Sequence, residues 1–179
     1  MMHKPLDAQG MINALKLLDK ELNAKARLVV GGGAAMVLAY NHPLATQDVY
    51  AFAARGGLRI VDLDAAAKKV AASEGIAPDW LNSRFDTFTA VLPGDYATRL
   101  RRVFTGNHLE VEALSPEDLL IMKCFAGRDK DLPHARKLLR IADDLSIVDK
   151  QLALLVEKRY PGAQKAADFF DDLRDEGSE

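Results

Sequence analysis

The chain has 179 residues, of which 49% are hydrophobic, and its formal net charge is −2 at pH 7. This length and apolar content are enough for one substantial core with a small helical appendage. The near-neutral charge excludes general electrostatic attraction to DNA, RNA or anionic lipid, so we expect no strong nucleic-acid patch.

The cysteine content and the hydropathy pattern favour a cytoplasmic protein. A single cysteine, Cys124, excludes an internal disulfide and a cysteine-rich zinc site, and its apolar neighbours predict a buried thiol. The sequence has no run of 18 apolar residues, and its N-terminus lacks the apolar segment of a signal peptide. We therefore expect no membrane contact.

The first 40 residues predict a helix, a strand and a second helix. Asp7 is suited to cap the first helix, whose apolar residues at helical spacing reach Leu22. Residues 27–30 are typical of a buried strand, and this strand runs directly into three glycines. Small residues then predict a short helix over residues 34–40.

The three glycines, Gly31, Gly32 and Gly33, stand where the strand passes into the helix. Free backbone N–H groups at a helix N-terminus can bind a phosphate. The alternative is a tight turn that lets the helix pack close to its strand. No Lys-Ser/Thr pair follows and the glycines are contiguous, so the turn is neither an NTPase phosphate loop nor a dinucleotide-binding fingerprint.

A second strand is predicted over residues 46–52. An unpaired carboxylate among apolar neighbours is unfavourable, so we expect Asp48 to be paired or to bind a cation. Metal-dependent phosphoryl transfer uses two acids at alternate strand positions, but the second position holds Tyr50, and a neutral phenol is a poor magnesium ligand. Asp48, water and the phosphates of a substrate could still hold one Mg²⁺. The two-residue period places four side chains on one face: Thr46, Asp48, Tyr50 and Phe52.

The middle of the chain predicts one more helix and three more strands. The helix covers residues 62–73, and a loop with the single tryptophan follows at residues 78–82. The strands are expected at residues 87–92, 100–104 and 109–114.

Two acids of the last strand, Glu110 and Glu112, share a face and are candidates for a further metal ligand. If Gly106 and Asn107 form a two-residue turn, Arg101 lies opposite Glu112, and a cross-strand ion pair is the alternative. In the functional interpretation, the basic residues before the turn form a cationic rim for a triphosphate or an RNA end: Arg99, Arg101 and Arg102.

From Ser115 onward the pattern is helical. Serine as cap, proline in the first turn and an acid three residues after the serine predict a helix that ends at Gly127. Another helix begins near Pro133, and residues 147–173 continue in helical pattern.

Two charged residues of this part have structural interpretations. Lys123 interrupts the most apolar helix of the chain, and its amine can extend to the surface. Asp131 lies in a charged turn and can cap the helix that begins near Pro133.

The alternation of strands and helices predicts an α/β (α+β) fold. We expect a sheet-and-helix core over residues 1–114 and a helical C-terminal part over residues 115–179 packed on the same domain.

Five short motifs in this order resemble those of one family. They are the Gly-Gly-Gly-Ala-Ala turn, the Thr-Gln-Asp-Val strand, and residues 78–82, 114–123 and 128–132. Over about residues 26–139 the chain resembles the small bacterial nucleotidyltransferase-like proteins of the polymerase-β superfold, which are related to the nucleotidyltransferase toxins of abortive-infection systems. The resemblance implies a small mixed twisted sheet flanked by helices, with the glycines holding nucleotide phosphates.

The resemblance also implies roles for single residues. Asp48 corresponds to the first metal acid of the family, and Lys123 and Asp131 correspond to characteristic positions of its helical part. The family pattern Asp-hydrophobic-Asp is interrupted at Tyr50, so the metal motif is degenerate. Together the motif positions and the residue chemistry give these expected site residues: Asp48, Glu112 and Lys123 for catalysis, Gly31, Gly32, Gly33, Thr46 and Arg101 for nucleotide binding, and Asp48 and Glu110 for Mg²⁺.

Three functions follow from these expectations. The first is a nucleotidyltransferase that moves a nucleoside monophosphate from an NTP to a hydroxyl of RNA or protein with Mg²⁺. The second is a catalytically degenerate nucleotide-binding module, or a toxin–antitoxin-type partner of a protein from a neighbouring gene, with the acidic helical C-terminus as a contact region. The third is a structural domain that binds no nucleotide.

Overall fold

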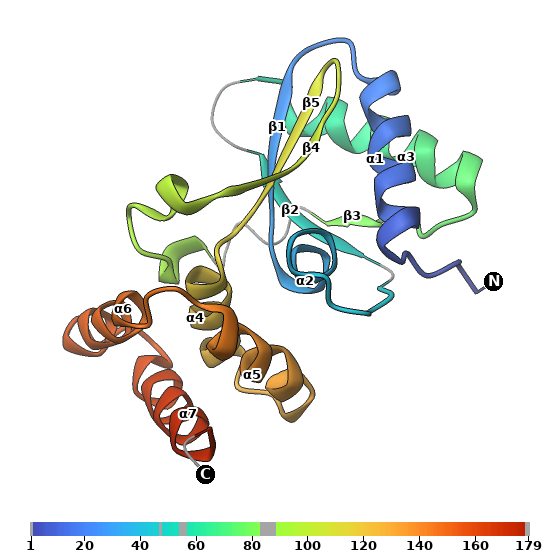
Figure 1. The fold of residues 1–179 in the computed structure, drawn as a ribbon. Helices are drawn as coiled ribbons and strands as arrows, with labels where there is room; N and C mark the ends of the chain where they lie inside the picture. Colours follow the sequence, from blue (N-terminus) through green and yellow to red (C-terminus); the bar gives the residue numbers. More distant parts are fainter. Residues whose placement is uncertain (1, 47, 54–56, 83–88, 178–179) are drawn as a thin grey trace. The chain divides into compact units, whose positions relative to one another are not determined.

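The computed structural model describes residues 2–46, 48–53, 57–82 and 89–177 (Figure 1). These residues form two compact units whose sequences are interleaved. Unit 1 contains residues 1–87 and 100–114, and unit 2 contains residues 88–99 and 115–179. In the described part of the chain, no helix is both long and apolar enough to cross a membrane.

Unit 1 is built on a five-stranded mixed sheet in the order β3-β2-β1-β5-β4. β1 pairs with β5, and β2 with β3, in parallel, whereas β1–β2 and β4–β5 are antiparallel. This mixed sheet with helices confirms the predicted fold class. The strands are β1 (Ala26–Val30), β2 (Val49–Ala53), β3 (Leu81–Asn82), β4 (Arg101–Thr105) and β5 (Leu109–Ala113).

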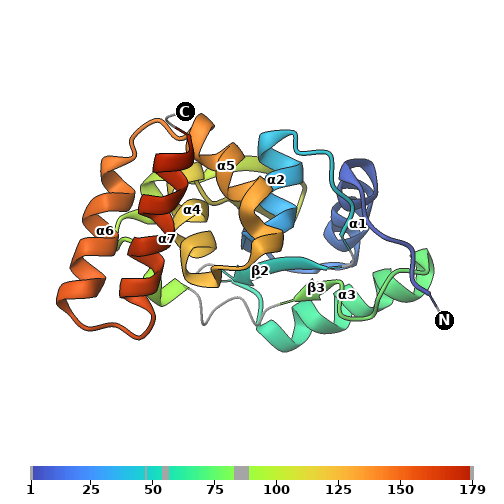
Figure 2. The ribbon, with the colours of Figure 1, turned by 90° about the horizontal axis from the view of Figure 1, so that it is seen from below.

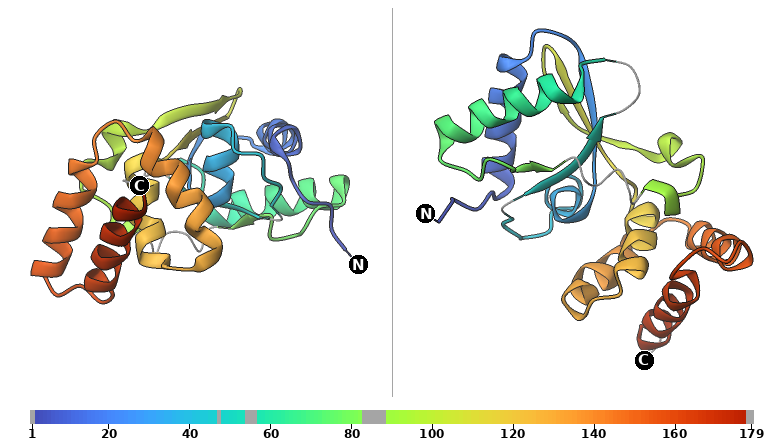
Figure 3. Two further views of the ribbon diagram at one scale, coloured as in Figure 1. Left: turned by 60° about the horizontal axis from the view of Figure 1, so that its bottom comes forward. Right: turned by 180° about the vertical axis from the view of Figure 1, so that it is seen from behind.

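Three helices belong to unit 1: α1 (Ala8–Glu21), α2 (Gly32–Tyr40) and α3 (Ile60–Glu74). The carboxylate of Asp7 accepts from the N–H of Gly10 at 2.8 Å, which confirms the predicted cap. Figure 1 shows α1 and α3 side by side on one face of the sheet, and the reverse view in Figure 3 agrees.

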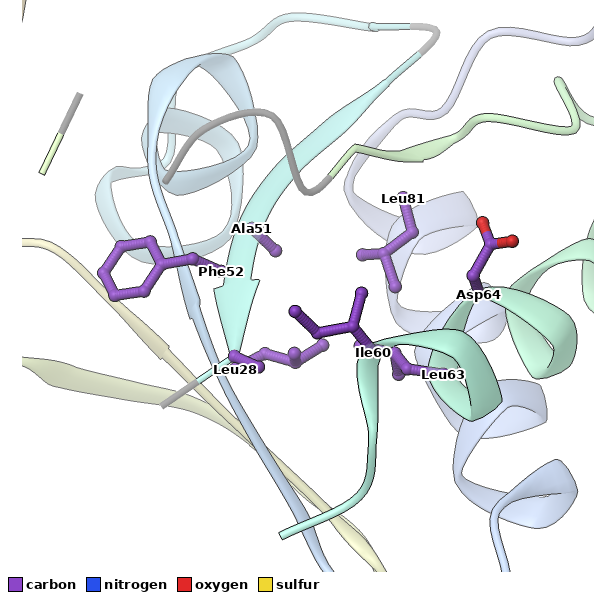
Figure 4. Close-up of a pocket in the computed structure, with 8 residues that line it drawn as sticks. Leu28, Ala51, Phe52, Ile60, Leu63, Asp64 and Leu81 are labelled. Carbon is purple, nitrogen blue, oxygen red and sulfur yellow. The ribbon is translucent and has the colours of Figure 1, made fainter. Parts of the chain in front are cut away.

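The alternation of side chains along the strands separates two faces of this sheet. The helix face carries apolar residues, and a cavity of about 100 Å³ lies between it and α3 (Figure 4). The other face is called the polar face below. It carries the side chain of Val29, the residues paired with Val29 across the sheet, and the residues two positions away from these along each strand. Its residues are Arg27, Val29, Tyr50, Phe52, Arg102, Glu110 and Glu112.

Unit 2 is helical and has α4 (Pro116–Ala126) at its centre. Figure 2 shows α4 among the three helices that it contacts. The hydroxyl of Ser115 accepts from the N–H of Asp118, and Gly127 ends the helix in the left-handed conformation, so both predicted helix signals are confirmed. The other elements are η2 (Tyr96–Arg99), η3 (Asp129–Asp131), α5 (Leu132–Ile141), α6 (Ser146–Glu157) and α7 (Ala163–Glu176).

Two predicted strands differ from the structure. The second strand begins at Val49, because the backbone of Thr46 pairs with Leu6 instead of continuing the sheet. Of the strand expected at residues 87–92, the first two residues lie outside the described part. The rest forms a helical turn in which the N–H of Leu92 donates to Thr89, so the prediction of a strand is wrong there.

The register of the β4–β5 hairpin also differs. Thr105 pairs with Glu110 because the loop wraps around the carboxylate of Asp19, which accepts from three loop N–H groups. A bulge between Arg102 and Phe104 then shifts the pairing back by one residue. As a result, Arg102 and not Arg101 lies opposite Glu112.

Candidate functional site

The glycine turn joins β1 to α2. Gly31 is extended and its N–H donates to the carbonyl of Tyr50 at 3.0 Å, whereas Gly32 has a φ of 57°, in the left-handed region that favours glycine. Gly31 is the N-cap residue, and among the described residues no side-chain cap hydrogen bond is present at this helix end. The first N–H groups of α2, beginning at Gly32 and Gly33, therefore face out of the helix end, where the helix dipole favours an anion.

Tyr50 contacts this turn directly. A Cβ atom at Gly32 would lie 3.2 Å from Cδ2 of Tyr50, a tight contact that a side chain there could make only if the tyrosine ring shifted slightly. On the other side, a Cβ atom at Gly33 would lie 3.2 Å from Cδ2 of Leu44. The tight-turn interpretation is thus supported by the close packing at Gly32 and Gly33 and by the left-handed conformation of Gly32, whereas phosphate binding by the turn stays a prediction.

Asp48 immediately precedes β2, two residues before Tyr50. It is half-buried, and the hydroxyl of Thr46 donates to its Oδ1 at 3.0 Å. In return, the N–H of Asp48 donates to the hydroxyl of Thr46 at 3.4 Å. Thr46 therefore orients the carboxylate, at the strand end that the glycine turn contacts.

Glu112 is the most enclosed acid of the polar face, with 9% of its side chain exposed. Two arginines bind it. Nε and Nη2 of Arg27 donate to Oε2 at 2.7 and 2.5 Å, and Nη2 of Arg102 donates to Oε1 at 3.2 Å. Arg102 also contacts Glu110 at 3.3 Å. The predicted ion pair of Glu112 is therefore observed, but its partners are Arg102 and Arg27 and not Arg101.

The donor groups do not fit a resident pair of Mg²⁺ ions. Tyr50, two residues after Asp48, offers a phenol and no carboxylate, and the charge of Glu112 is already balanced by two guanidinium groups. Within the described residues, no three histidine, cysteine or acidic side chains are close enough to hold a metal. What remains is one carboxylate, Asp48, beside the glycine turn.

Arg101, expected to bind nucleotide, lies on the helix face. It pairs with Ala113, and its guanidinium lies 5.8 Å from the ring centroid of Tyr40 on α2. Arg27 was not among the expected site residues, but its position two residues before Val29 on the same strand places it on the polar face.

Lys123 and Asp131 both belong to unit 2 and bind each other. Nζ of Lys123 donates to Oδ1 of Asp131 at 2.6 Å, and Nε of Arg128 donates to Oδ2 at 2.6 Å. Burial raises the pKa of Asp131, but Arg128 and Lys123 lower it, and the net pKa lies below its usual value.

Both structural interpretations of this pair are wrong. Lys123 does not extend to the surface, because α4 is buried almost all round and its amine meets Asp131 inside the unit. Asp131 makes no side-chain cap at α5, because its two oxygens are bound by Lys123 and Arg128.

The mixed five-stranded sheet with its helices is consistent with a nucleotidyltransferase-like α+β fold. Residues 9–156 match the family described as "Nucleotidyltransferase of unknown function (DUF6036)", and the chain belongs to that family. No curated protein and no solved structure matches the chain. The resemblance to a nucleotidyltransferase-like family is thereby confirmed.

Proposed function

We propose that this chain binds an NTP at the glycine turn and transfers its nucleoside monophosphate to a hydroxyl of RNA or protein. The observation that carries the proposal is the uncapped N-terminus of α2 directly beside the strand end that holds Asp48. The acceptor oxygen would attack the α-phosphorus, and pyrophosphate would leave with the electrons of the broken P–O bond.

Each group at the turn has a defined part in this proposal. The N–H groups of Gly32 and Gly33 would bind phosphate oxygens. Asp48, oriented by Thr46, would bind the Mg²⁺ that accompanies the nucleotide, because carboxylate oxygens are preferred ligands of this ion.

The first test is transfer of label from each α-³²P-labelled NTP to total RNA or to protein, with Mg²⁺ or Mn²⁺. We expect labelled product from the wild-type chain and a loss of about a hundredfold or more in Asp48→Asn, because one carboxylate ligand is removed. Asp79→Asn, an exposed acid in unit 1, is the matched control and should keep full activity. Equal activity of both variants would contradict the role of Asp48.

A second candidate is a nucleotide-binding module that does not transfer, of the kind that partners a protein from a neighbouring gene. Two observations favour it: Tyr50 stands in the second acid position, and two arginines already bind Glu112. A nucleotide-dependent rise in melting temperature without any labelled product would support this candidate, since a ligand that binds only the native state stabilises it. If nucleotide neither raises the melting temperature nor yields labelled product, both candidates fail and the third function, a structural domain, is favoured.

A further inference from the structure

The two arginines on the polar face bind Glu112 unequally. Arg27 makes the short contacts expected of a charge-assisted hydrogen bond, at 2.7 and 2.5 Å. Arg102 makes only longer ones, at 3.2 and 3.4 Å to Glu112, 3.3 Å to Glu110 and 3.5 Å to the hydroxyl of Thr105. Arg102 is thus divided among three acceptors, each at a long distance.

The surroundings of the two groups also differ. The Arg102 side chain is 43% exposed, whereas that of Glu112 is 9% exposed. If Arg102 turned toward another anion, Glu112 would keep its short pair with Arg27, and no buried charge would be left without a partner. The exchange therefore avoids the large penalty of an isolated buried charge.

Arg102 also lies within reach of the glycine turn. Arg102, Glu112 and Val29 are neighbours in one cross-strand row, and the turn begins two residues beyond Val29. With strands about 4.8 Å apart and a rise of about 3.3 Å per residue, the backbones at Arg102 and Gly31 are about 12 Å apart, two strand spacings across and two residues along. The long side chain of Arg102 and a triphosphate chain bound at the turn together can span that separation.

We propose that Arg102 is a phosphate-binding residue that exchanges Glu110 and Glu112 for the phosphates of a bound nucleotide. A guanidinium group binds two phosphate oxygens in parallel, which is a better geometry than its present three contacts. This inference rests on the proposed function, because it requires the phosphates to lie at the glycine turn.

The exchange predicts effects of opposite sign for two substitutions. The probes are inorganic tripolyphosphate and ATP, titrated without metal by isothermal calorimetry. Arg102→Gln should weaken binding of both probes by about tenfold or more, since a charged hydrogen-bonding group is lost. Glu110→Gln should strengthen binding a few-fold, because a competing acceptor of Arg102 is removed.

Arg59→Gln is the matched control. It removes one exposed arginine of unit 1 that is paired with Asp62 on α3, and we expect its affinity to equal that of the wild type. Equal weakening in Arg59→Gln and Arg102→Gln would overturn the proposal, because the effect would then be general electrostatics.

The remaining outcomes separate this inference from the proposed function. If the wild-type chain binds neither probe, the proposed function fails. If the wild-type chain binds the probes and Arg102→Gln binds them equally well, only the inference about Arg102 is overturned and the proposed function stands. A gain of affinity in Glu110→Gln supports the exchange independently, because a misfolded variant does not gain affinity.

Discussion

Charged side chains in the centre of unit 2 are buried because each has a specific partner. Lys123 binds Asp131, Arg99 donates to the fully buried Asp118 at 2.9 Å, and Glu117 accepts two loop N–H groups at 2.7 and 3.1 Å. Burying a charge is unfavourable without such a partner. The charges on α4 therefore fix which segments pack around it.

Replacing Lys123 with methionine should destabilise the fold. The change keeps much of the side-chain volume but leaves Asp131 buried with only Arg128, so we expect a loss of about 3 kcal/mol in the free energy of unfolding. Urea unfolding followed by circular dichroism measures it. Lys130→Met, on the exposed side of the same turn, should change stability by less than about 0.5 kcal/mol. Similar losses in both variants would argue against the buried pair.

Tyr50 stands two residues after Asp48, at the position where the proposed metal site would need a second carboxylate. Tyr50→Asp should strengthen Mg²⁺-dependent nucleotide binding, because a second carboxylate then lies two residues from Asp48 on the same strand face. Titration of a nucleotide with and without Mg²⁺ measures the change. Tyr50→Phe removes only the hydroxyl and serves as control. A Tyr50→Asp variant whose nucleotide affinity does not respond to Mg²⁺ would show that this face does not point into a metal site.

At the scale of elements, one side chain fixes the β4–β5 hairpin. The carboxylate of Asp19, on α1, accepts from the N–H groups of Asn107, His108 and Leu109 at 2.9, 2.7 and 2.7 Å. Burial raises the pKa of Asp19, but these donors lower it, and the net pKa lies below its usual value. The ionised form therefore holds the loop that sets the hairpin register.

The stability that Asp19 contributes should depend on pH. Because its pKa is lowered on folding, the contribution is complete above the usual value of about 4 and is lost as the pH falls through the folded-state pKa. Asp19→Asn should be less stable than the wild type by about 1–2 kcal/mol at pH 7, and this gap should narrow below pH 4. Urea unfolding at several pH values measures it. A gap that stays constant down to pH 2 would contradict the role of the charge.

For the molecule as a whole, the two units are interleaved in sequence, so the helical unit is not one continuous stretch of chain. Unit 2 includes residues 88–99 as well as 115–179. Within that segment Arg99 balances the buried Asp118, and the carbonyl of Val91 accepts from Nε2 of the buried Gln151 at 2.8 Å. The helical part is therefore incomplete without a segment that precedes the last two strands.

A fragment of residues 115–179 should fail to fold cooperatively. It keeps α4 to α7 but leaves Asp118 and Gln151 without the partners that segment 88–99 supplies. Thermal unfolding by circular dichroism should give a broad transition for the fragment and a sharp one for the intact chain. A sharp transition in the fragment would show that the segment is not needed.

Local signals in the sequence predicted individual elements well. The caps at Asp7 and Ser115 and the end at Gly127 depend on hydrogen bonds within a few residues, and all three are confirmed. The buried Cys124 is also confirmed, and burial raises the pKa of its thiol to about 12. Trp80 lies outside the strands, directly before β3, as the loop prediction requires, but it is fully buried and donates from Nε1 to the carbonyl of Ala67.

The sequence by itself determined the helix caps at Asp7 and Ser115, the helix end at Gly127, the strand before the three glycines and the mixed α/β class, because these follow from short-range hydrogen bonding and from the spacing of apolar residues. Only the tertiary structure decided the partners of the charged side chains. Glu112 binds Arg27 and Arg102, and Lys123 binds Asp131, because a bulge, a loop wrapped around Asp19 and the close packing of α4 bring these groups together. Arg27 and Glu112 are 85 residues apart in the chain, and the nearer pairs depend on a hairpin register and on a turn packed against α4, which the spacing of residue types does not encode.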